Sequence, residues 1–251
     1  MFSTPVSSSS SSTFVSRLTV ALGLGLGLGC ACLSQAAEPV KVFNGKDLSG
    51  WDTKQGKGTS KWTVGEPSVD PADPKLLRAG GSGLGSGNSF ALVNLAAKHG
   101  DSLDIYSKQK FGNCRIELEV MVPKNSNSGI YVMGEYEVQV FDSFGKDKMQ
   151  PSDMGAIYGA AVPSVNASKA PGEWQKYVIE WQAPKFDAAG KKTANGKFLK
   201  VELNGQVLHK DLEMPGPTPA GVTGKEAAEG PIMFQGDHGP VAYRNIVITP
   251  M

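Results

Sequence analysis

Residues 134–142 carry alternating polar and apolar side chains, and the polar members are of types that do chemistry. The segment reads G-E-Y-E-V-Q-V-F-D. In a β-strand, Glu135, Glu137 and Gln139 would fall on one face and apolar residues on the other. Two carboxylates and an amide in one row can hydrogen-bond sugar hydroxyls, bind a cation or transfer a proton. The row therefore predicts a carbohydrate site on a β-sheet.

Asp142 ends this segment, and its position depends on the regularity of the strand. Strict alternation would place it on the apolar face with Val138 and Val140. A β-bulge near Val140 or Phe141 would turn it onto the face of Glu137 and Gln139. We expect such a bulge, which would make Asp142 a catalytic residue. The alternative is that Asp142 ends the strand and caps a turn.

Asn127 and Ser128 lie in the segment N-S-N-S-G-I, just before the acidic strand. They would present polar side chains at the mouth of a strand, where Gly129 allows a ligand or a neighbouring strand to approach closely. The alternative is a polar turn between two strands. Because the segment directly precedes the acidic strand, we expect both side chains to bind substrate.

The segment Q-G-D-H-G, residues 235–239, lies between two late expected strands. It supplies Gln235 as a hydrogen-bonding side chain and His238 as a proton-transfer group that titrates near neutral pH. The alternative is a hairpin loop in which Asp237 is only a turn residue.

Arg244 and Trp174 each have two interpretations. Arg244 interrupts an apolar strand, where it would clamp a ligand and stabilise an anion or form a structural salt bridge with an acid on a neighbouring strand. Trp174 follows Pro171-Gly172-Glu173 and would be either a platform for a sugar ring or a core residue.

Metal-ligand motifs with a defined spacing are absent from the sequence, which contains no H-E-x-x-H, C-x-x-C or EF-hand loop. The sequence assigns no cofactor, but it leaves room for a single divalent cation held by carboxylates. It also lacks the G-x-S-x-G segment of serine hydrolases.

Short strands separated by Gly, Pro, Asn and Asp account for most of the pattern along the chain. Residues 91–99 are the one stretch with helical periodicity, and residues 66–88 and 215–230 are expected to form long loops, which are uncommon unless they shape a site. Asn204-Gly205 predicts a tight hairpin, because both residues tolerate a positive φ. The pattern indicates a single all-β domain, a sandwich or barrel. The expected strands cover residues 112–122, 128–133, 136–141, 174–181, 198–203, 206–209, 231–235 and 241–249.

Residues 1–36 are expected to be a secretory signal peptide, because Arg17 precedes an apolar stretch and Ser34-Gln35-Ala36 offers a cleavage site. The mature domain would cover residues 37–251, secreted or periplasmic and without a membrane span. Lipid attachment at Cys30 or Cys32 is the less favoured alternative. Of the 25 basic residues the leader removes Arg17, which leaves 24 basic against 24 acidic residues. This balance argues against nucleic-acid binding, and Cys114 would remain as a buried thiol.

The motifs in order resemble the 3-keto-disaccharide hydrolase domain family, long known as domain of unknown function 1080. The similarity covers about residues 40–250. One departure is Gly236, an insertion in a loop that often reads Q-D-H-G in the family. The matching blocks are F-N-G-K-D-L-S-G-W from Phe43, N-S-G-I from Asn127, Y-E-V-Q from Tyr136 with Asp142, G-A-I-Y-G from Gly155, P-S-V-N-A from Pro163, P-G-E-W from Pro171, G-P-I from Gly230 and Y-R-N-I from Tyr243.

The resemblance implies a concanavalin A-like jelly-roll β-sandwich that acts on glycosides carrying a ketone at C3. The ketone acidifies the C2 proton, so a base forms an enolate, the enolate expels the aglycone from C1, and water adds back. Some members would perform only the lyase or hydratase half. On this hypothesis Glu137 is the base or a cation ligand, and His238 is the acid.

The remaining roles follow from the same resemblance. Asp142 and Gln139 would orient the base or the sugar, and Arg244 or a bound cation would stabilise the enolate. Tyr158 and Trp174 would line the sugar pocket. The oligomeric state is left open.

Three other functions compete with this hypothesis. A non-catalytic carbohydrate-binding module would share the fold but would have no use for several carboxylates in one row. An ordinary glycoside hydrolase would use Glu135 and Glu137 as its carboxyl pair. A structural or adhesive surface protein is the third alternative.

Overall fold

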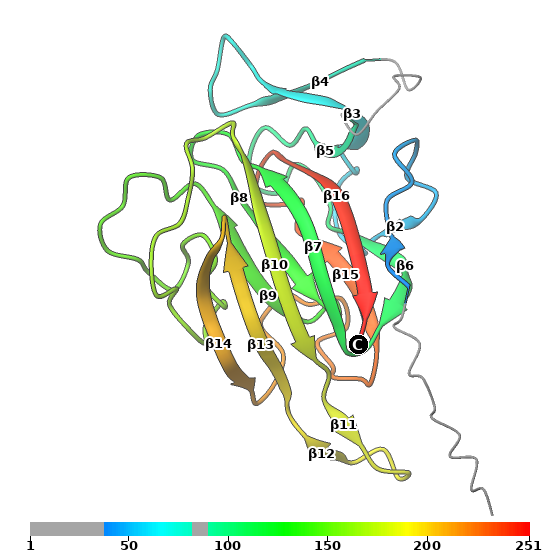
Figure 1. The fold of residues 1–251 in the computed structure, drawn as a ribbon. Coiled ribbons are helices and arrows are strands. Elements are labelled where there is room, and N and C mark those ends of the chain that lie inside the picture. Colours follow the sequence, from blue (N-terminus) through cyan, green and yellow to red (C-terminus); the bar gives the residue numbers. More distant parts are fainter. Residues whose placement is uncertain (1–37, 82–89) are drawn as a thin grey trace, which may run out of the picture. The chain divides into compact units, whose positions relative to one another are not determined.

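The computed structural model describes residues 38–81 and 90–251, and within these ranges all regular secondary structure is β-strand (Figure 1). A nine-stranded antiparallel sheet forms one layer, and β1 joins it by pairing with β16. In spatial order the strands are β14 (Gln206–Met214), β13 (Gly196–Leu203), β10 (Trp174–Gln182), β7 (Cys114–Met121), β16 (Val241–Pro250), β5 (Ala91–Asn94), β3 (Trp62–Val69) and β4 (Leu77–Gly80), with β1 (Val40–Lys41) off this path.

A five-stranded antiparallel sheet packs against the nine-stranded one, and a separate small hairpin lies outside both. The hairpin consists of β11 (Lys185–Phe186) and β12 (Lys192–Ala194). The order of the five-stranded sheet is β2 (Trp51–Thr53), β6 (Ile105–Phe111), β15 (Gly230–Phe234), β8 (Asn127–Val132) and β9 (Tyr136–Phe141).

The inward faces of the two sheets form one hydrophobic core, as alternating strands require. Phe234 of β15 stacks on Tyr243 of β16 with ring centroids 3.9 Å apart, which joins the two layers. The hydroxyl of Tyr243 lies 2.9 Å from the Ser128 hydroxyl, so this buried polar group has a partner. The fold is a concanavalin A-like jelly-roll β-sandwich, and the prediction of its class is confirmed.

The predicted hairpin at Asn204-Gly205 is present between β13 and β14, where both residues have positive φ angles, of 51° and 84°.

Two other predictions of local structure are wrong. Residues 91–94 form the buried strand β5 instead of a helical turn, because tertiary pairing with β3 and β16 outweighs a weak helical pattern. The expected loop at residues 66–88 contains the end of β3 and the whole of β4, which pair with each other.

The N-terminal features lie outside the described residues, so the signal peptide and lipidation remain predictions. Among the residues that the structure describes, there is no helix of the length and hydrophobicity needed to cross a membrane. Cys114 is buried in β7, as expected from its phase in the strand.

Candidate active site

A cavity of about 260 Å³ opens on the outer face of the five-stranded sheet. Strands β8 and β9 supply its floor, and the loops around residues 219 and 238 supply its walls. Six residues expected from the sequence meet here, although they come from separate parts of the chain. The lining residues are Asn127, Tyr131, Glu137, Gln139, Ser152, Tyr158, Pro219, Ala220, Gln235 and His238.

Glu137 lies on the floor of this cavity, opposite Tyr131 in the β8–β9 ladder. Its side chain lies over Gly129, where an added Cβ would come within 2.2 Å of the carboxylate oxygen Oε1. Gly129 is therefore required for the position of the carboxylate, which is the close approach expected of a glycine inside a strand.

The Glu137 carboxyl is buried, and burial raises its pKa to about 7. The Tyr131 hydroxyl and the charge of His238 oppose this rise, whereas Asp104 and Asp237 add to it. A carboxyl group with a pKa near neutrality can exist in both protonation states at physiological pH, as a general base must.

Three amide side chains surround Glu137 with hydrogen-bonding capacity that the protein does not use. The Oδ1 atom of Asn127 and the Oε1 atoms of Gln139 and Gln235 are buried and have no hydrogen-bond partner among the described residues. Buried acceptors without partners are rare in folded proteins because they cost free energy. Hydroxyl groups of a bound ligand are suitable donors for all three.

The loop between β14 and β15 contributes Pro219 and Ala220 to the cavity wall, and Glu135 holds this loop in place. The Glu135 carboxylate accepts hydrogen bonds from the backbone N and Oγ1 of Thr223 and from the backbone N of Gly224, at 2.8–2.9 Å. The Thr218 hydroxyl accepts from the backbone N of Glu137 and donates to the carbonyl of Glu135. Glu135 therefore serves the architecture of the site, while Glu137 faces the cavity.

The loop after β15 brings His238 to the cavity wall. Its Nδ1 lies 2.5 Å from Oδ1 of Asp237, and this hydrogen bond is the main cause of the raised pKa of His238. His238 lines the cavity despite the inserted Gly236, whose backbone N donates to Asp104 at 2.9 Å. A Cβ at Gly236 would come within 2.2 Å of the Leu103 carbonyl oxygen, which explains why the extra residue is a glycine.

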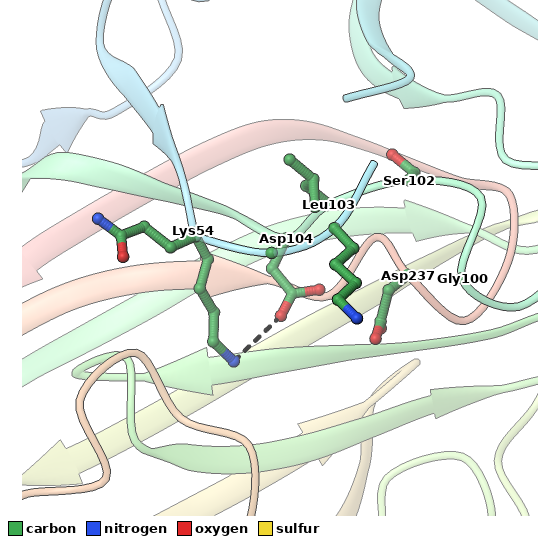
Figure 2. A pocket seen from close by; sticks show the side chains of 9 residues that line it. Lys54, Gly100, Ser102, Leu103, Asp104 and Asp237 are labelled. Atoms are coloured by element: carbon green, nitrogen blue, oxygen red, sulfur yellow. Dashed lines mark hydrogen bonds and ion pairs between the residues drawn. The ribbon is translucent and has the colours of Figure 1, made fainter. Parts of the chain in front are cut away.

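A second cavity of about 160 Å³ lies beside this loop and is lined by Lys54, Asp104 and Asp237 among others (Figure 2). The ammonium group of Lys54 lies 3.4 Å from Asp104 and donates to the Ala220 carbonyl at 2.5 Å. Burial is the main cause of the raised pKa of Asp104. A basic and an acidic group thus stand directly beside the main cavity.

Two predicted site residues on neighbouring elements do not reach the cavity. Ser128 points into the core, where its hydroxyl donates to the Gln235 carbonyl at 2.7 Å. Asp142 caps a turn, because its carboxylate accepts from the backbone N of Asn125 and of Phe144. The expected bulge is wrong, since β8 and β9 pair in continuous register from Asn127 and Phe141 to the other end of the strands.

Arg244 and Trp174 lie on the outer face of the nine-stranded sheet, which corrects their expected place in the sugar pocket. Arg244 Nε donates to Glu119 at 2.6 Å, and its guanidinium packs 3.9 Å from the centroid of the Trp174 ring. Strand alternation explains this position. The neighbouring residue on β16, Tyr243, points into the core, so Arg244 points to the opposite face. Arg244 forms the structural salt bridge that was the alternative interpretation.

The sequence did not identify Tyr131, Lys54 or Asp104 as site residues. Tyr131 could have been found from strand pairing, because it lies opposite Glu137 once the hairpin register is known. Lys54 and Asp104 come from distant segments, and no local pattern connects them with residues 235–239.

Residues 38–249 match the model of the 3-keto-alpha-glucoside-1,2-lyase-like domain family. The chain belongs to this family. A 116-residue segment is 31% identical to a Bacteroides thetaiotaomicron protein named 3-keto-disaccharide hydrolase. The segment covers 45% of this chain and 32% of that relative.

Two solved structures from Parabacteroides distasonis, both provisionally named glycosyl hydrolases, have related folds. The first is 29% identical with a TM-score of 0.60, and the match covers 85% of this chain and 84% of that one. The second is 17% identical with a TM-score of 0.54, covers 85% and 94% of the two chains, and supports the fold alone.

Proposed function

We propose that this protein is a carbohydrate-active enzyme that cleaves 3-keto-glycosides by abstracting the proton at C2. The observation that carries the proposal is Glu137, a buried carboxyl with a pKa of about 7 among three amide oxygens that lack partners. Membership of the 3-keto-alpha-glucoside-1,2-lyase-like family supports the substrate class. The names of the similar proteins support glycosidic-bond cleavage in general.

The reaction begins when ionised Glu137 takes the C2 proton, which the neighbouring ketone makes acidic. The electron pair of the C2–H bond moves into the enolate. The enolate then reforms its carbonyl as the bond from C1 to the aglycone oxygen breaks, and the leaving oxygen takes a proton. Addition of water across C1 and C2 completes hydrolysis, whereas release before this step would make the protein a lyase.

The amide groups position the sugar for this proton transfer. Asn127, Gln139 and Gln235 offer acceptors for ring hydroxyl groups. Tyr158 is partly exposed at the cavity and offers an aromatic surface to the sugar ring. Binding at these groups would hold C2 near the Glu137 carboxylate, which is the orientation that proton abstraction requires.

His238 stands on the cavity wall with a pKa raised mainly by its hydrogen bond to Asp237. Two roles fit this position: proton donor to the leaving oxygen, and ligand of a cation together with neighbouring side chains. Arg244 does not serve as the enolate stabiliser, because it is bonded to Glu119 on the other sheet.

The ordinary glycosidase alternative requires a second carboxyl group facing Glu137. Glu135 does not fit that role, because its carboxylate is bonded to Thr223 and Gly224 and does not line the same cavity.

The proposed place of action is outside the cytoplasm, in agreement with the signal-like N-terminus.

A direct test compares a disaccharide such as trehalose with its 3-keto form. The wild-type protein should convert the keto form alone, and Glu137→Gln should lower this conversion by at least about 100-fold without unfolding the protein. Conversion of an unoxidised nitrophenyl glycoside would support the glycosidase instead. Binding of plain glucans without any product would support a carbohydrate-binding module.

A further inference from the structure

His99, Asp237 and His238 bring three metal-ligating side chains together from two loops. One ligand atom of each residue lies within 4.8 Å of the others. The two imidazole rings meet edge to face, with centroids 4.4 Å apart and an interplanar angle of 87°. His99 comes from the loop between β5 and β6, and the other two residues come from the loop between β15 and β16.

Hydrogen bonds that involve none of these three side chains hold the two loops in place. The backbone N of Gly100 donates to the Asp237 carbonyl at 2.6 Å. The buried side chain of Asn94 donates to the carbonyls of Gly236 and Gly239 at 2.7 and 2.8 Å. The backbone that carries the three metal-ligating side chains is therefore held in a defined position, as the geometry of a metal site requires.

We propose that His99, Asp237 and His238 bind one divalent transition-metal ion. Two imidazoles and one carboxylate form a donor set that suits manganese, iron, cobalt or zinc and leaves coordination positions open. Ligands of one ion lie closer together than 4.8 Å, so binding needs an inward movement of the exposed His99 side chain and an adjustment of the hydrogen-bonded pair Asp237 and His238.

The position of this donor set connects it with the proposed reaction. His238 lines the cavity that contains Glu137, and Asp237 lines the neighbouring cavity shown in Figure 2. An ion between the two cavities would offer its open positions to the substrate. This assignment of a role, unlike metal binding itself, rests on the proposed function.

The ion would stabilise the enolate oxygen at C3, the role that Arg244 does not fill. His238 would then act as a ligand, and the leaving oxygen would receive its proton from Glu137, which has just taken the proton from C2. The proton is thus conserved between C2 and the leaving group. His238 could act as a proton donor or as a metal ligand, whereas His99 matters for metal binding alone. A His99 variant therefore tests the metal-ligand role separately.

The experiment titrates chelator-treated full-length protein with Mn²⁺, Co²⁺ or Zn²⁺ alone, using isothermal calorimetry and the visible absorption of Co²⁺. The wild-type protein should bind one equivalent of at least one ion. His99→Gln and His238→Gln should each weaken that binding at least about 10-fold, since even partners outside the ligand shell contribute 10- to 100-fold. Lys98→Gln is the matched control, because Lys98 is exposed and directly precedes His99.

A second control is His209→Gln. The chain has three histidines, and His209 bonds the Gly155 carbonyl away from this cluster, so it should leave binding unchanged. Absence of binding, or equal binding by wild type and His99→Gln, would overturn the metal site. Full turnover of a 3-keto-disaccharide in excess chelator would overturn the catalytic role of the ion while the proposed function stands. Metal binding without any turnover would preserve the site and contradict the function.

Discussion

The outer faces of the two sheets differ in how they treat their polar side chains. On the nine-stranded sheet, charged residues pair with each other: Arg115 lies 2.6 Å from Glu180, and Arg244 lies 2.6 Å from Glu119. On the five-stranded sheet, Glu137 is buried with a raised pKa, and the amides beside it have oxygens without partners among the described residues.

This difference distinguishes polar residues that pair with each other on a solvent-exposed sheet face from polar residues that are available to bind a ligand. Both faces carry Glu residues at alternate strand positions, so their sequences look alike. Exposed ion pairs contribute little to stability. Buried polar groups without hydrogen-bond partners cost free energy. Where a fold keeps such groups at a cavity, they are suited to hydrogen-bond a ligand that enters it.

The largest expected effect is on Glu137. Replacement by Gln keeps the shape but removes the base, so turnover of a 3-keto-disaccharide should fall by about 100- to 10,000-fold. Steady-state kinetics measures the effect, and thermal unfolding confirms that the variant is folded. Turnover within about twofold of wild type would remove Glu137 from the mechanism.

Gly129→Ala should have the next largest effect, because the new Cβ would overlap the Glu137 carboxylate. A displaced carboxylate should lower kcat by roughly 100-fold. The matched control is Gly80→Ala in β4, another strand glycine without a positive φ, where a Cβ would meet only the Glu66 carbonyl oxygen at an ordinary 3.7 Å. Equal losses of activity in the two variants would show that the replacement of a strand glycine in general, and not the displaced carboxylate, is responsible.

The raised pKa of Glu137 also predicts a pH-dependent effect on stability. Since the folded-state pKa of about 7 lies above the reference value of 4.5, the fold favours the protonated carboxyl. Wild type should therefore lose stability as pH rises between these values, by about 2–3 kcal/mol. Glu137→Gln should not show this loss, so urea unfolding at pH 5 and pH 8 should reveal a stability gain at pH 8 only. A gain of equal size at both pH values would contradict the assigned pKa.

Gln139→Leu should have a smaller effect, confined to substrate binding. It removes one hydrogen bond to the sugar, worth about 0.5–1.5 kcal/mol, which corresponds to an increase in KM of roughly 2- to 12-fold. The free energy of unfolding should stay the same or rise, because the variant removes a buried acceptor without a partner. A strongly destabilised variant with unchanged KM would indicate a structural amide.

The smallest effect is expected on the other sheet. Arg244→Gln removes an ion pair with Glu119 whose side chains are both partly exposed, so stability should fall by no more than about 1 kcal/mol. Turnover should be unchanged, because Arg244 does not line the cavity. A large loss of turnover with normal stability would show that the outer face of the nine-stranded sheet also takes part in the reaction, which contradicts the proposed difference between the two faces.

The sequence predicted the fold class and most strands because period-2 alternation and turn residues are local signals. It also placed Glu137 and Gln139 on one face, which the β8–β9 register confirms. It misplaced Asp142 because a bulge cannot be read from composition, and here the regular ladder leaves that carboxylate at a turn.

Arg244 and Trp174 were misplaced for a different reason. Alternation identifies two faces of a strand but does not say which sheet the strand joins. Arg244 is an unusual residue in an apolar strand, and its partner Glu119 lies 125 positions away in sequence. Pairings of this kind depend on topology, as does the approach of His99 to His238.

The central claim is that Glu137 removes the proton at C2, and deuterium at that carbon tests it most directly. A 3-keto-disaccharide labelled at C2 should yield a product without the label in ordinary water, because elimination removes the deuteron and hydration returns a proton from solvent. Mass spectrometry of the early product, compared with labelled product incubated without enzyme, measures the exchange. Complete retention of the label in the enzymatic product would contradict C2 abstraction and identify direct hydrolysis at C1.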